Sequence, residues 1–185
     1  MRISDVTDAE LANRAATGDS DAFRQLVERY GPAVRRVART VLRNPDDADD
    51  AAQDGFWAAW RSLDRYDRSR PFGPWLLRIV LNAARDLGRR RQVRATEPLT
   101  EASPTSGPLP DELADRAQMR DRLAAALSAL PERQRLVVVL FEVEGYAHRE
   151  IAQLLNVAEG TVRSDIFHAR RALRAALGAD GRIVR

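Results

Sequence analysis

The residues of this chain best suited to chemistry are arginines, and they gather in two places. The stretch from Arg85 to Arg94 carries five arginines against one acid, Asp86. A second group, Arg170, Arg171 and Arg174, lies near the C-terminus. Arginine offers planar donors that fit phosphates and guanine edges. The chain has no lysine and a sequence pI of about 10.1. An arginine-only basic set is also what a GC-rich genome produces, so the positions of the charges carry more information than their number.

Enzymatic and metal chemistry find little support. There is no cysteine, and the two histidines, His148 and His168, lie within or beside the second arginine-rich region. No Gly-rich phosphate loop, nucleophile motif or metal-ligand spacing is present. We therefore expect a protein that is not an enzyme and holds no metal or cofactor.

The composition also indicates in which cellular compartment the protein works. Without cysteine, disulfides are excluded, which suits a reducing cytoplasm. No run approaches the roughly 20 apolar residues of a membrane span, and the N-terminus has no signal-peptide stretch. We expect a cytoplasmic protein without membrane insertion.

The most specific local pattern, at residues 145–163, is a short helix, a tight turn and a second helix. In a helix-turn-helix the start of the second helix reaches base edges, while flanking arginines hold phosphates. Asp165 weakens this interpretation, because phosphates repel a carboxylate unless it pairs with an arginine. The alternative is a helical bundle whose solvated face happens to be basic. Residues expected to face inward are Ile151, Ala152, Leu155, Val157, Val162 and Ile166.

Helices are predicted for almost all of the chain before residue 95. Thr7 and Glu10 have capping-box spacing. Gly31–Pro32 is expected to end one helix and to precede another. Asn44–Pro45 should start the next, with Asn as N-cap and Pro in the first turn. A further helix is expected to begin at Pro74 and to run to the arginine-rich end.

The helix after Asn44 combines acids and aromatic residues. Asp46 and Asp47 in its first turn are expected to be solvated acids favoured by the helix dipole. Its apolar side is predicted to consist of Phe56, Trp57, Trp60 and Leu63.

A linker divides the chain. Residues 96–112 hold four prolines among Ser, Thr and Gly and have no apolar period. Fully extended, this segment would reach roughly 55 Å. It separates residues 1–95 from residues 113–178, with a tail at 179–185. The predicted fold is all-α, with two small helical domains joined by a Pro-rich linker.

One segment is ambiguous. Leu136–Phe141 is rich in β-branched residues, which favour a strand. We nevertheless predict a buried helix, because Pro131–Glu132 makes a good helix start and no second strand is available for pairing.

Two separate parts of the chain resemble the sigma-70 family, in the family's order. Residues 145–173, with their EIAQLL, GTVRS and AR segments, resemble region 4. Residues 50–54, followed by Phe56 and Trp60, resemble region 2.2, and residues 70–82 resemble regions 2.3 and 2.4. The match is closest to the extracytoplasmic-function group, which keeps only regions 2 and 4.

The resemblance implies three sets of site residues. Those expected to face the β′ clamp helices of core RNA polymerase are Asp50, Gln53, Asp54, Phe56 and Trp60. Those expected to hold the −10 strand are Phe72, Trp75, Arg78, Asn82, Arg85, Arg89 and Arg90. Those expected to read the −35 duplex are Thr161, Arg163, Ser164, Phe167, His168 and Arg171.

The sequence departs from the family in three of these places. Asp165 and His168 stand where the family usually carries Arg, which should weaken phosphate contacts and shift base preference. Asp54 is shorter than the usual Glu. From the residues alone, Trp75 is expected in the core, and Asn82 fits a base reader or a helix cap equally well.

The implied function is that of a bacterial sigma factor. Such a protein binds the β′ clamp helices and the β flap of core polymerase, directs it to promoters through −35 duplex and single-stranded −10 DNA, and promotes strand opening. The resemblance also implies an anti-sigma partner. The alternatives are a helix-turn-helix regulator that acts without core polymerase and a helical adaptor that binds only protein.

Overall fold

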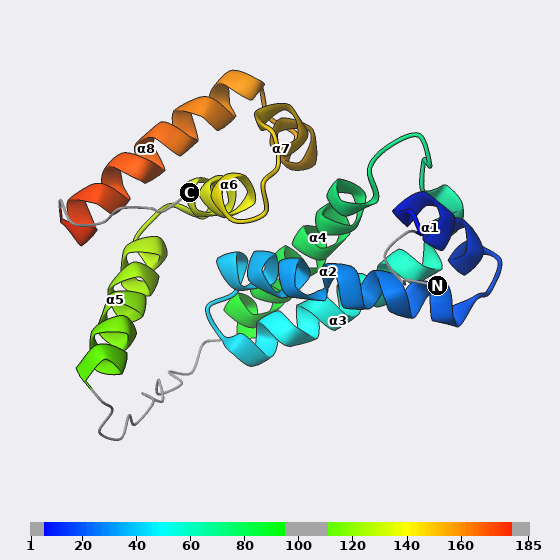
Figure 1. The fold of residues 1–185 in the computed structure, drawn as a ribbon, viewed down its shortest axis with the longest axis horizontal. Helices are drawn as coiled ribbons and strands as arrows, with labels where there is room; N and C mark the ends of the chain where they lie inside the picture. The colour runs from blue at the N-terminus through cyan, green and yellow to red at the C-terminus, as the bar shows by residue number, and fades with distance from the viewer. Residues whose placement is uncertain (1–5, 95–110, 179–185) are drawn as a thin grey trace.

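The computed structural model describes residues 6–94 and 111–178, which form eight α-helices and one 3-10 helix and contain no strand (Figure 1). The predicted all-α class is therefore confirmed. The elements are α1 (Asp8–Ala16), α2 (Ser20–Val41), α3 (Pro45–Arg61), η1 (Leu63–Arg65), α4 (Phe72–Arg94), α5 (Asp111–Ser128), α6 (Glu132–Glu142), α7 (His148–Leu155) and α8 (Glu159–Leu177).

Helices α1 to α4 form an N-terminal bundle in which α3 and α4 approach closely. A Cβ atom at Gly55 would lie 2.6 Å from Cγ2 of Val80 and 3.1 Å from its Cα. The side of α3 that faces the core is a stripe of small residues: Ala48, Ala51, Ala52, Gly55 and Ala59 are all buried. Because small residues occupy that contact, the large aromatic residues of α3 lie elsewhere on the helix.

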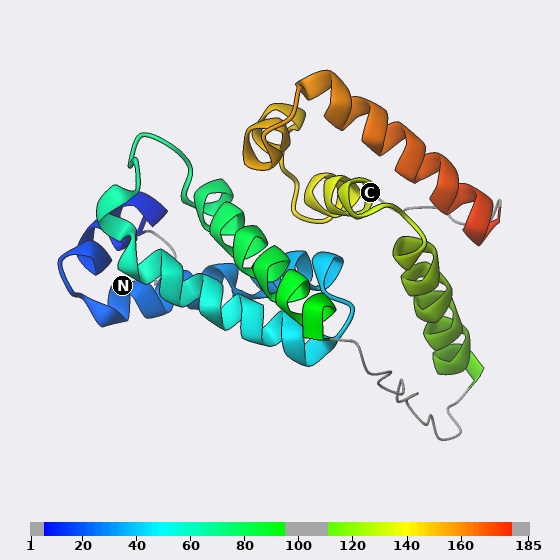
Figure 2. The same cartoon turned by 180° about the vertical axis from the view of Figure 1, so that it is seen from behind.

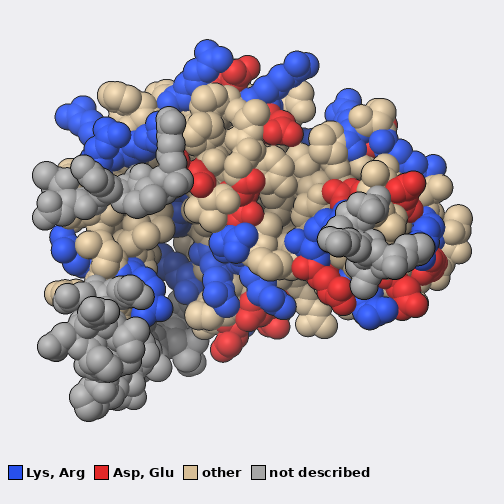
Figure 3. Space-filling model, viewed as in Figure 1, with Lys and Arg blue, Asp and Glu red and all other residues tan. Residues whose placement is uncertain are grey.

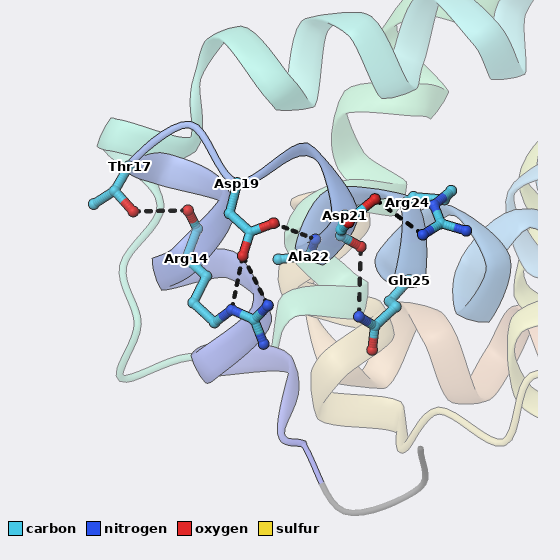
Figure 4. Close-up of polar contacts among 7 residues, drawn as sticks. All are labelled: Arg14, Thr17, Asp19, Asp21, Ala22, Arg24 and Gln25. Carbon is cyan, nitrogen blue, oxygen red and sulfur yellow. Dashed lines mark hydrogen bonds and ion pairs between the residues drawn. The ribbon is translucent and has the colours of Figure 1, made fainter.

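The turn between α1 and α2 is fixed by polar contacts (Figure 4). The N-cap Asp19 accepts a hydrogen bond from the backbone N–H of Ala22 at 3.0 Å and another from Nε of Arg14 at 2.9 Å. The Ala22 bond, followed by the Arg14 contact, lowers the pKa of Asp19. These contacts set where α2 begins. The predicted capping box of Thr7 and Glu10 at the start of α1 is confirmed.

Two predicted helix starts in this bundle were wrong. Helix α2 continues through Pro32, because Pro32 and Glu28, whose carbonyl loses its usual donor, both lie on the exposed side. Helix α4 begins at Phe72, before Pro74. The start at Asn44–Pro45 is confirmed, with the Asn44 side chain accepting from the N–H of Asp46 at 2.8 Å.

Asp47 is not the solvated acid that was expected. Only 8% of it is exposed, and it forms an ion pair with Arg91 near the end of α4. Asp46 is exposed as predicted. The first turn of α3 is therefore tied to the arginine-rich end of α4.

Helices α5 to α8 form a C-terminal bundle. The predicted buried helix around Leu136–Phe141 is confirmed as α6, in which five consecutive residues, 136–140, are buried. A helix that is apolar on all sides must be covered on all sides. Val138 and Val139 pack in a cluster with α5 and α8, whereas Leu136, Val137 and Leu140 belong to a cluster that runs into the N-terminal bundle.

The linker can be described only at its end. Helix α5 begins at Asp111 and so includes the last two residues of the predicted linker, Asp111 and Glu112. The remainder of that prediction, and the predicted tail at 179–185, lie outside the described residues.

The two bundles pack against each other. Helix α6 contacts α2, and α7 contacts α4, so that α6 and α7 lie between α8 and the N-terminal bundle (Figures 1 and 2). No helix among the described residues is long and apolar enough to cross a membrane.

Candidate nucleic-acid and partner surfaces

A groove of about 740 Å³ runs between α2 and α3. Its floor and walls are largely apolar, and Arg35 and Asp49 make a polar end where their side chains approach to 3.9 Å. Phe23 packs edge-on against Trp60, with ring centroids 4.7 Å apart, which holds one wall in place. The lining residues are Ser20, Phe23, Val27, Gly31, Arg35, Asp49, Ala52, Gln53, Phe56, Trp57 and Trp60.

The residues predicted to bind polymerase divide between the groove and its surroundings. Gln53, Phe56 and Trp60 line the groove, whereas Asp50 and Asp54 are exposed on α3 outside the lining. Leu63, predicted on the apolar side of the same helix, lies buried in η1.

Trp57 lines the groove but was not among the residues predicted to bind polymerase. It was predicted to pack on the apolar side of its helix, but 58% of it is exposed. The sequence did contain a signal for this exposure. The small residues of α3 form the stripe that contacts the core, so Trp57 lies on another side of the helix. An exposed tryptophan beside an apolar groove is typical of a protein–protein contact site.

A second surface follows α4. The predicted −10 residues Arg78 and Asn82 are exposed, and Trp75, Arg78, Asn82, Arg85 and Arg89 recur at three- and four-residue spacing. That spacing puts them on one side of the helix. The structure therefore brings this part of the predicted site together.

The loop before α4 is built on buried aromatic rings. Phe72 is 2% exposed and contacts Tyr30, Tyr66 and Trp75, with centroids 5.3–5.5 Å apart. The Tyr66 hydroxyl donates to the carbonyl of Arg70 at 2.5 Å, which fixes the loop. Phe72 thus packs in the core beneath the loop. Trp75, which was expected in the core, is half-buried against Phe72.

Three of the six arginines of α4 pair with acids. Arg85 contacts Glu132 of α6 at 3.0 Å, Arg89 pairs with Asp86 and Arg91 pairs with Asp47. Arg90 is exposed. The local excess of positive charge read from the sequence is therefore reduced in the folded chain.

The helix-turn-helix is confirmed in α7 and α8. Asn156 ends α7 in the left-handed region, with φ 55°, and the N–H of Val157 donates to the Ala152 carbonyl at 3.0 Å. Ile151, Val162 and Ile166 are buried as predicted. The turn thereby fixes the angle at which α8 leaves α7.

The predicted −35 residues lie mainly on the outer face of α8. Phe167 is 63% exposed and packs edge-on to His168, with centroids 5.5 Å apart. Arg163 pairs with Glu159 of the same helix at 2.5 Å. Ser164, His168 and Arg171 are exposed and Thr161 is half-buried. Figure 3 shows basic side chains along the edge that α8 forms in Figure 1.

Asp165 faces away from this surface. It is 5% exposed, and Arg133 of α6 donates to its two carboxylate oxygens at 2.6 and 3.4 Å. The hydrogen bond to Asp165 raises the pKa of Arg133. Asp165 therefore joins α8 to α6. Because its carboxylate is turned away from the outer face of α8, the expected repulsion of DNA phosphates does not apply there.

Arg170, which belongs to the C-terminal arginine group, packs inward and not toward the outer face of α8. It pairs with Glu142 and lies 5.4 Å from the ring centroid of Phe141, on which His148 stacks at 4.7 Å. This leaves Arg171 and Arg174 as the exposed arginines after the readers.

Potential metal ligands do not cluster within residues 6–94 and 111–178. No group of three or more His, Cys, Asp or Glu side chains in these ranges is placed to hold a metal ion.

Comparison with known proteins identifies both bundles. Residues 26–94 match the family model for Sigma-70 region 2, and residues 120–173 match that for Sigma-70, region 4. The chain is 40% identical over 182 residues to the RNA polymerase sigma factor CnrH of Cupriavidus metallidurans, covering 94% of this chain and 95% of CnrH. It is 39% identical over 175 residues to the ECF RNA polymerase sigma factor SigM of Mycobacterium tuberculosis, covering 93% and 85%.

A solved structure agrees. CnrH in complex with the cytosolic domain of CnrY superimposes with a TM-score of 0.69 at 39% identity, over 94% of this chain and 98% of that one. The two matches in order, the long alignments and the shared all-helical fold lead to one assignment: the chain belongs to the sigma-70 family of RNA polymerase sigma factors, in its extracytoplasmic-function group.

Proposed function

We propose that this sigma factor docks on core RNA polymerase through the groove between α2 and α3. The groove presents apolar rings between a glutamine and an Arg–Asp pair, and acids Asp50 and Asp54 lie beside it. A partner helix with apolar and basic side chains, as the β′ clamp helices are expected to supply, fits this chemistry. The C-terminal bundle is proposed to contact the β flap.

The α4 face is proposed to hold the −10 strand once the duplex opens. Single strands are bound by aromatic platforms and basic grooves. Trp75 supplies a half-exposed ring, Asn82 an amide that can pair with a base edge, and Arg78 a donor for phosphate. Arg85, Arg89 and Arg90 extend the basic side along the helix.

Helix α8 is proposed to enter the major groove at the −35 element. Its exposed Phe167 suits the methyl group of thymine, and Arg163 suits a guanine edge after it leaves Glu159. Because Asp165 is directed inward, His168 is the departure from the family that should alter base preference.

One observation carries the proposal. A single chain presents an open aromatic groove on one bundle and an exposed recognition helix on the other, which neither a simple regulator nor a protein adaptor requires. The site of action would be the bacterial cytoplasm, where the polymerase works. By analogy with CnrH, which is solved in complex with CnrY, an anti-sigma protein is a proposed partner.

The test is reconstituted transcription. The purified chain and bacterial core polymerase are combined with a library of random promoters, and the transcripts are sequenced. Core-dependent initiation with enriched −35 and −10 elements would support the proposal. Duplex binding by the chain alone, without initiation, would favour a regulator that acts without polymerase.

The docking surface has its own test. Replacing Asp50 and Gln53 together with Ala should weaken binding to core polymerase. An unchanged affinity would remove these two residues from the proposed docking surface.

A further inference from the structure

Helix α1 contacts the part of the N-terminal bundle that leads into the proposed −10 surface. It packs on α2 and also contacts η1 and α4 (Figures 1 and 2). Asp8, its first residue, accepts a hydrogen bond from the Tyr30 hydroxyl of α2 and forms an ion pair with Arg29. Arg29 also donates to the carbonyl of Val6, at 3.2 Å. The Asp8 carboxylate therefore fixes the position of the Tyr30 hydroxyl against α1.

The position of Asp8 is itself set by the start of α1. The backbone N–H of Glu10 donates to Oγ1 of Thr7 at 3.2 Å, and the backbone N–H of Thr7 donates to Oε2 of Glu10 at 2.9 Å. Leu11 and Ala12 of the same helix are buried in the core. Because the first turn is capped and the helix is anchored, Asp8 can hold Tyr30 in place and does not have to follow it.

The ring of Tyr30 packs on the first turn of α4. Its centroid lies 5.5 Å from that of Phe72. A Cβ atom at Gly73 would lie 2.9 Å from Cε1 of Tyr30 and would also collide with the Tyr146 hydroxyl, so the ring and the backbone of α4 are in close contact. A shift of the Tyr30 ring toward α4 would therefore have to move the start of that helix.

The aromatic contacts continue from Phe72 to Trp75. The two ring centroids are 5.4 Å apart, and Tyr66 contacts both rings, at 5.3 Å from Phe72 and 5.0 Å from Trp75. Tyr66 and Phe72 are buried, whereas Trp75 is half-buried. Trp75 is the ring proposed to stack on a base of the −10 strand. A continuous path of contacts thus joins Asp8 to that ring.

Asp8 is unsuited to contact the strand itself. Its carboxylate is occupied by Tyr30 and Arg29, and a negative charge is repelled by DNA phosphates. An effect of Asp8 on strand binding would therefore have to pass through the residues that it holds.

We propose that Asp8 is a positioning residue for capture of the −10 strand: it holds the Tyr30 hydroxyl, which fixes the Phe72 ring and thereby the orientation of Trp75. Helix α1, which precedes the region 2 match at residues 26–94, thus contributes to strand capture. This inference rests on the proposed assignment of the α4 face to the −10 strand.

The test uses three single variants of the full chain, each bound to core polymerase. Asp8→Ala removes the acceptor, and Tyr30→Phe removes the hydroxyl but keeps the ring. The matched control is Arg14→Ala, which breaks an ion pair between the other end of α1 and Asp19, at 2.7 Å (Figure 4). Arg14 takes no part in the aromatic contacts and is not a proposed binding residue.

The probe is a single-stranded oligonucleotide with the −10 element enriched in the transcription test, in which 2-aminopurine replaces one base at a time. Stacking on an aromatic ring quenches this fluorophore, and the quench that Trp75→Ala removes identifies the stacked base. Asp8→Ala and Tyr30→Phe should each weaken binding roughly three- to tenfold and reduce that quench in the bound strand. Arg14→Ala should match the parent chain in both readouts.

A double variant tests the path. Asp8→Ala combined with Tyr30→Phe should bind the oligonucleotide no more weakly than the more affected single variant, because both changes remove the same hydrogen bond. Affinity for core polymerase and for −35 duplex DNA should stay unchanged throughout, which also shows that the variants are folded. Additive losses would refute a route through Tyr30.

The remaining outcomes separate the inference from the function on which it rests. Normal binding and normal quench in Asp8→Ala would refute the positioning role. So would equal losses in Arg14→Ala, because α1 would then act only as a general support. If Trp75→Ala changes neither binding nor quench at any position, the assignment of the α4 face to the −10 strand fails, and the inference falls with it.

Discussion

Helices α4 and α8 are both rich in arginine and both proposed to bind DNA, yet they differ in where the acids that pair with their arginines come from. In α4, Arg85, Arg89 and Arg91 pair with acids, two of which come from other helices. In α8, Arg163 and Arg170 pair with Glu159 and Glu142, both acids of the C-terminal bundle itself, and Arg171 and Arg174 are exposed. Basic residues in a sequence therefore do not by themselves measure how ready a surface is for DNA.

The difference has an energetic meaning. Ion pairs between exposed side chains contribute only about 0–1 kcal/mol, so a phosphate can replace Glu132 or Asp86 at little cost. Asp47 is only 8% exposed, so its separation from Arg91 costs more. The acids lower non-specific affinity without abolishing the site. Of the two arginines in the predicted −35 set on α8, Arg163 must break its ion pair with Glu159 before it can contact DNA.

The largest predicted effect tests the two faces of α8. Asp165→Arg restores the residue type usual in the family but places a cation in a buried site against Arg133. We expect the free energy of unfolding to fall by about 3–5 kcal/mol, as measured by urea denaturation. Ser164→Arg adds the same charge on the exposed face and should change stability by less than about 0.5 kcal/mol. Equal effects of the two changes would mean that Asp165 does not face α6.

The next largest predicted effect compares a crowded glycine between α3 and α4 with an open glycine on α8. Gly55→Ala puts a Cβ 3.1 Å from the backbone of Val80, so something must shift. A loss of about 2–3 kcal/mol in the free energy of unfolding is expected. Gly160→Ala meets nothing within 4 Å and should be neutral or slightly stabilising. A neutral Gly55→Ala would show that α3 and α4 are not in close contact there.

A third prediction asks whether the exposed ring of α3 is functional. Trp57→Ala should weaken binding to core polymerase by about 2 kcal/mol, or roughly 30-fold, measured by fluorescence titration. Val93→Ala removes another exposed apolar side chain, on α4, away from the groove lining, and should leave core affinity unchanged. If both variants bind like the parent, the groove is not the docking site.

A fourth prediction separates base reading from phosphate binding on α8. Arg163→Ala should cost about 1–2 kcal/mol at one −35 base pair. Arg171→Ala should instead weaken binding to all sequences alike and reduce the salt slope by about one. Competition among single-base −35 variants at several salt concentrations distinguishes the two. A uniform loss for Arg163→Ala would make it a phosphate contact.

Local structure was predicted better than contacts between distant segments. The start of α3 at Asn44–Pro45 follows from capping chemistry. The helix around Leu136–Phe141 follows from the need for a strand to have a partner. The exposure of Trp57, the inward turn of Asp165 and the continuation of α2 through Pro32 depend on which neighbouring helix covers each face. Such partners lie far away in the sequence, so the residue types alone could not identify them.

The same limit applies to the candidate site. Family spacing predicted a set of α8 residues that are mostly exposed and much of the α4 face. It did not reveal that Glu132, 47 positions after Arg85, would contact that arginine. Nor did it reveal that Phe72 supports its loop from the core. Both facts arise from packing between elements.

The smallest predicted effect concerns pH and the closed state of the chain, in which α6 and α7 pack against α2 and α4. Burial, with help from Glu144 and Glu150, raises the pKa of Tyr146 to about 12. Burial and the Asp8 carboxylate also raise the pKa of the neighbouring Tyr30. An exposed tyrosine titrates near pH 10. The closed state is thus fully favoured below about pH 10 and loses this contribution as the pH rises toward about 12.

At about pH 11 the loss should be about 1 kcal/mol, because the open state can ionise Tyr146 and the closed state cannot. Arginines remain charged there, so the ion pair between Arg36 of α2 and Glu144 persists and the effect stays small. Fluorophores on the two bundles should report a shift toward open chains between about pH 10 and 12, and Tyr146→Phe should reduce that shift. If Tyr146→Phe shows the same pH response as the parent chain, the Tyr146 hydroxyl has no part in closing α7 onto α4.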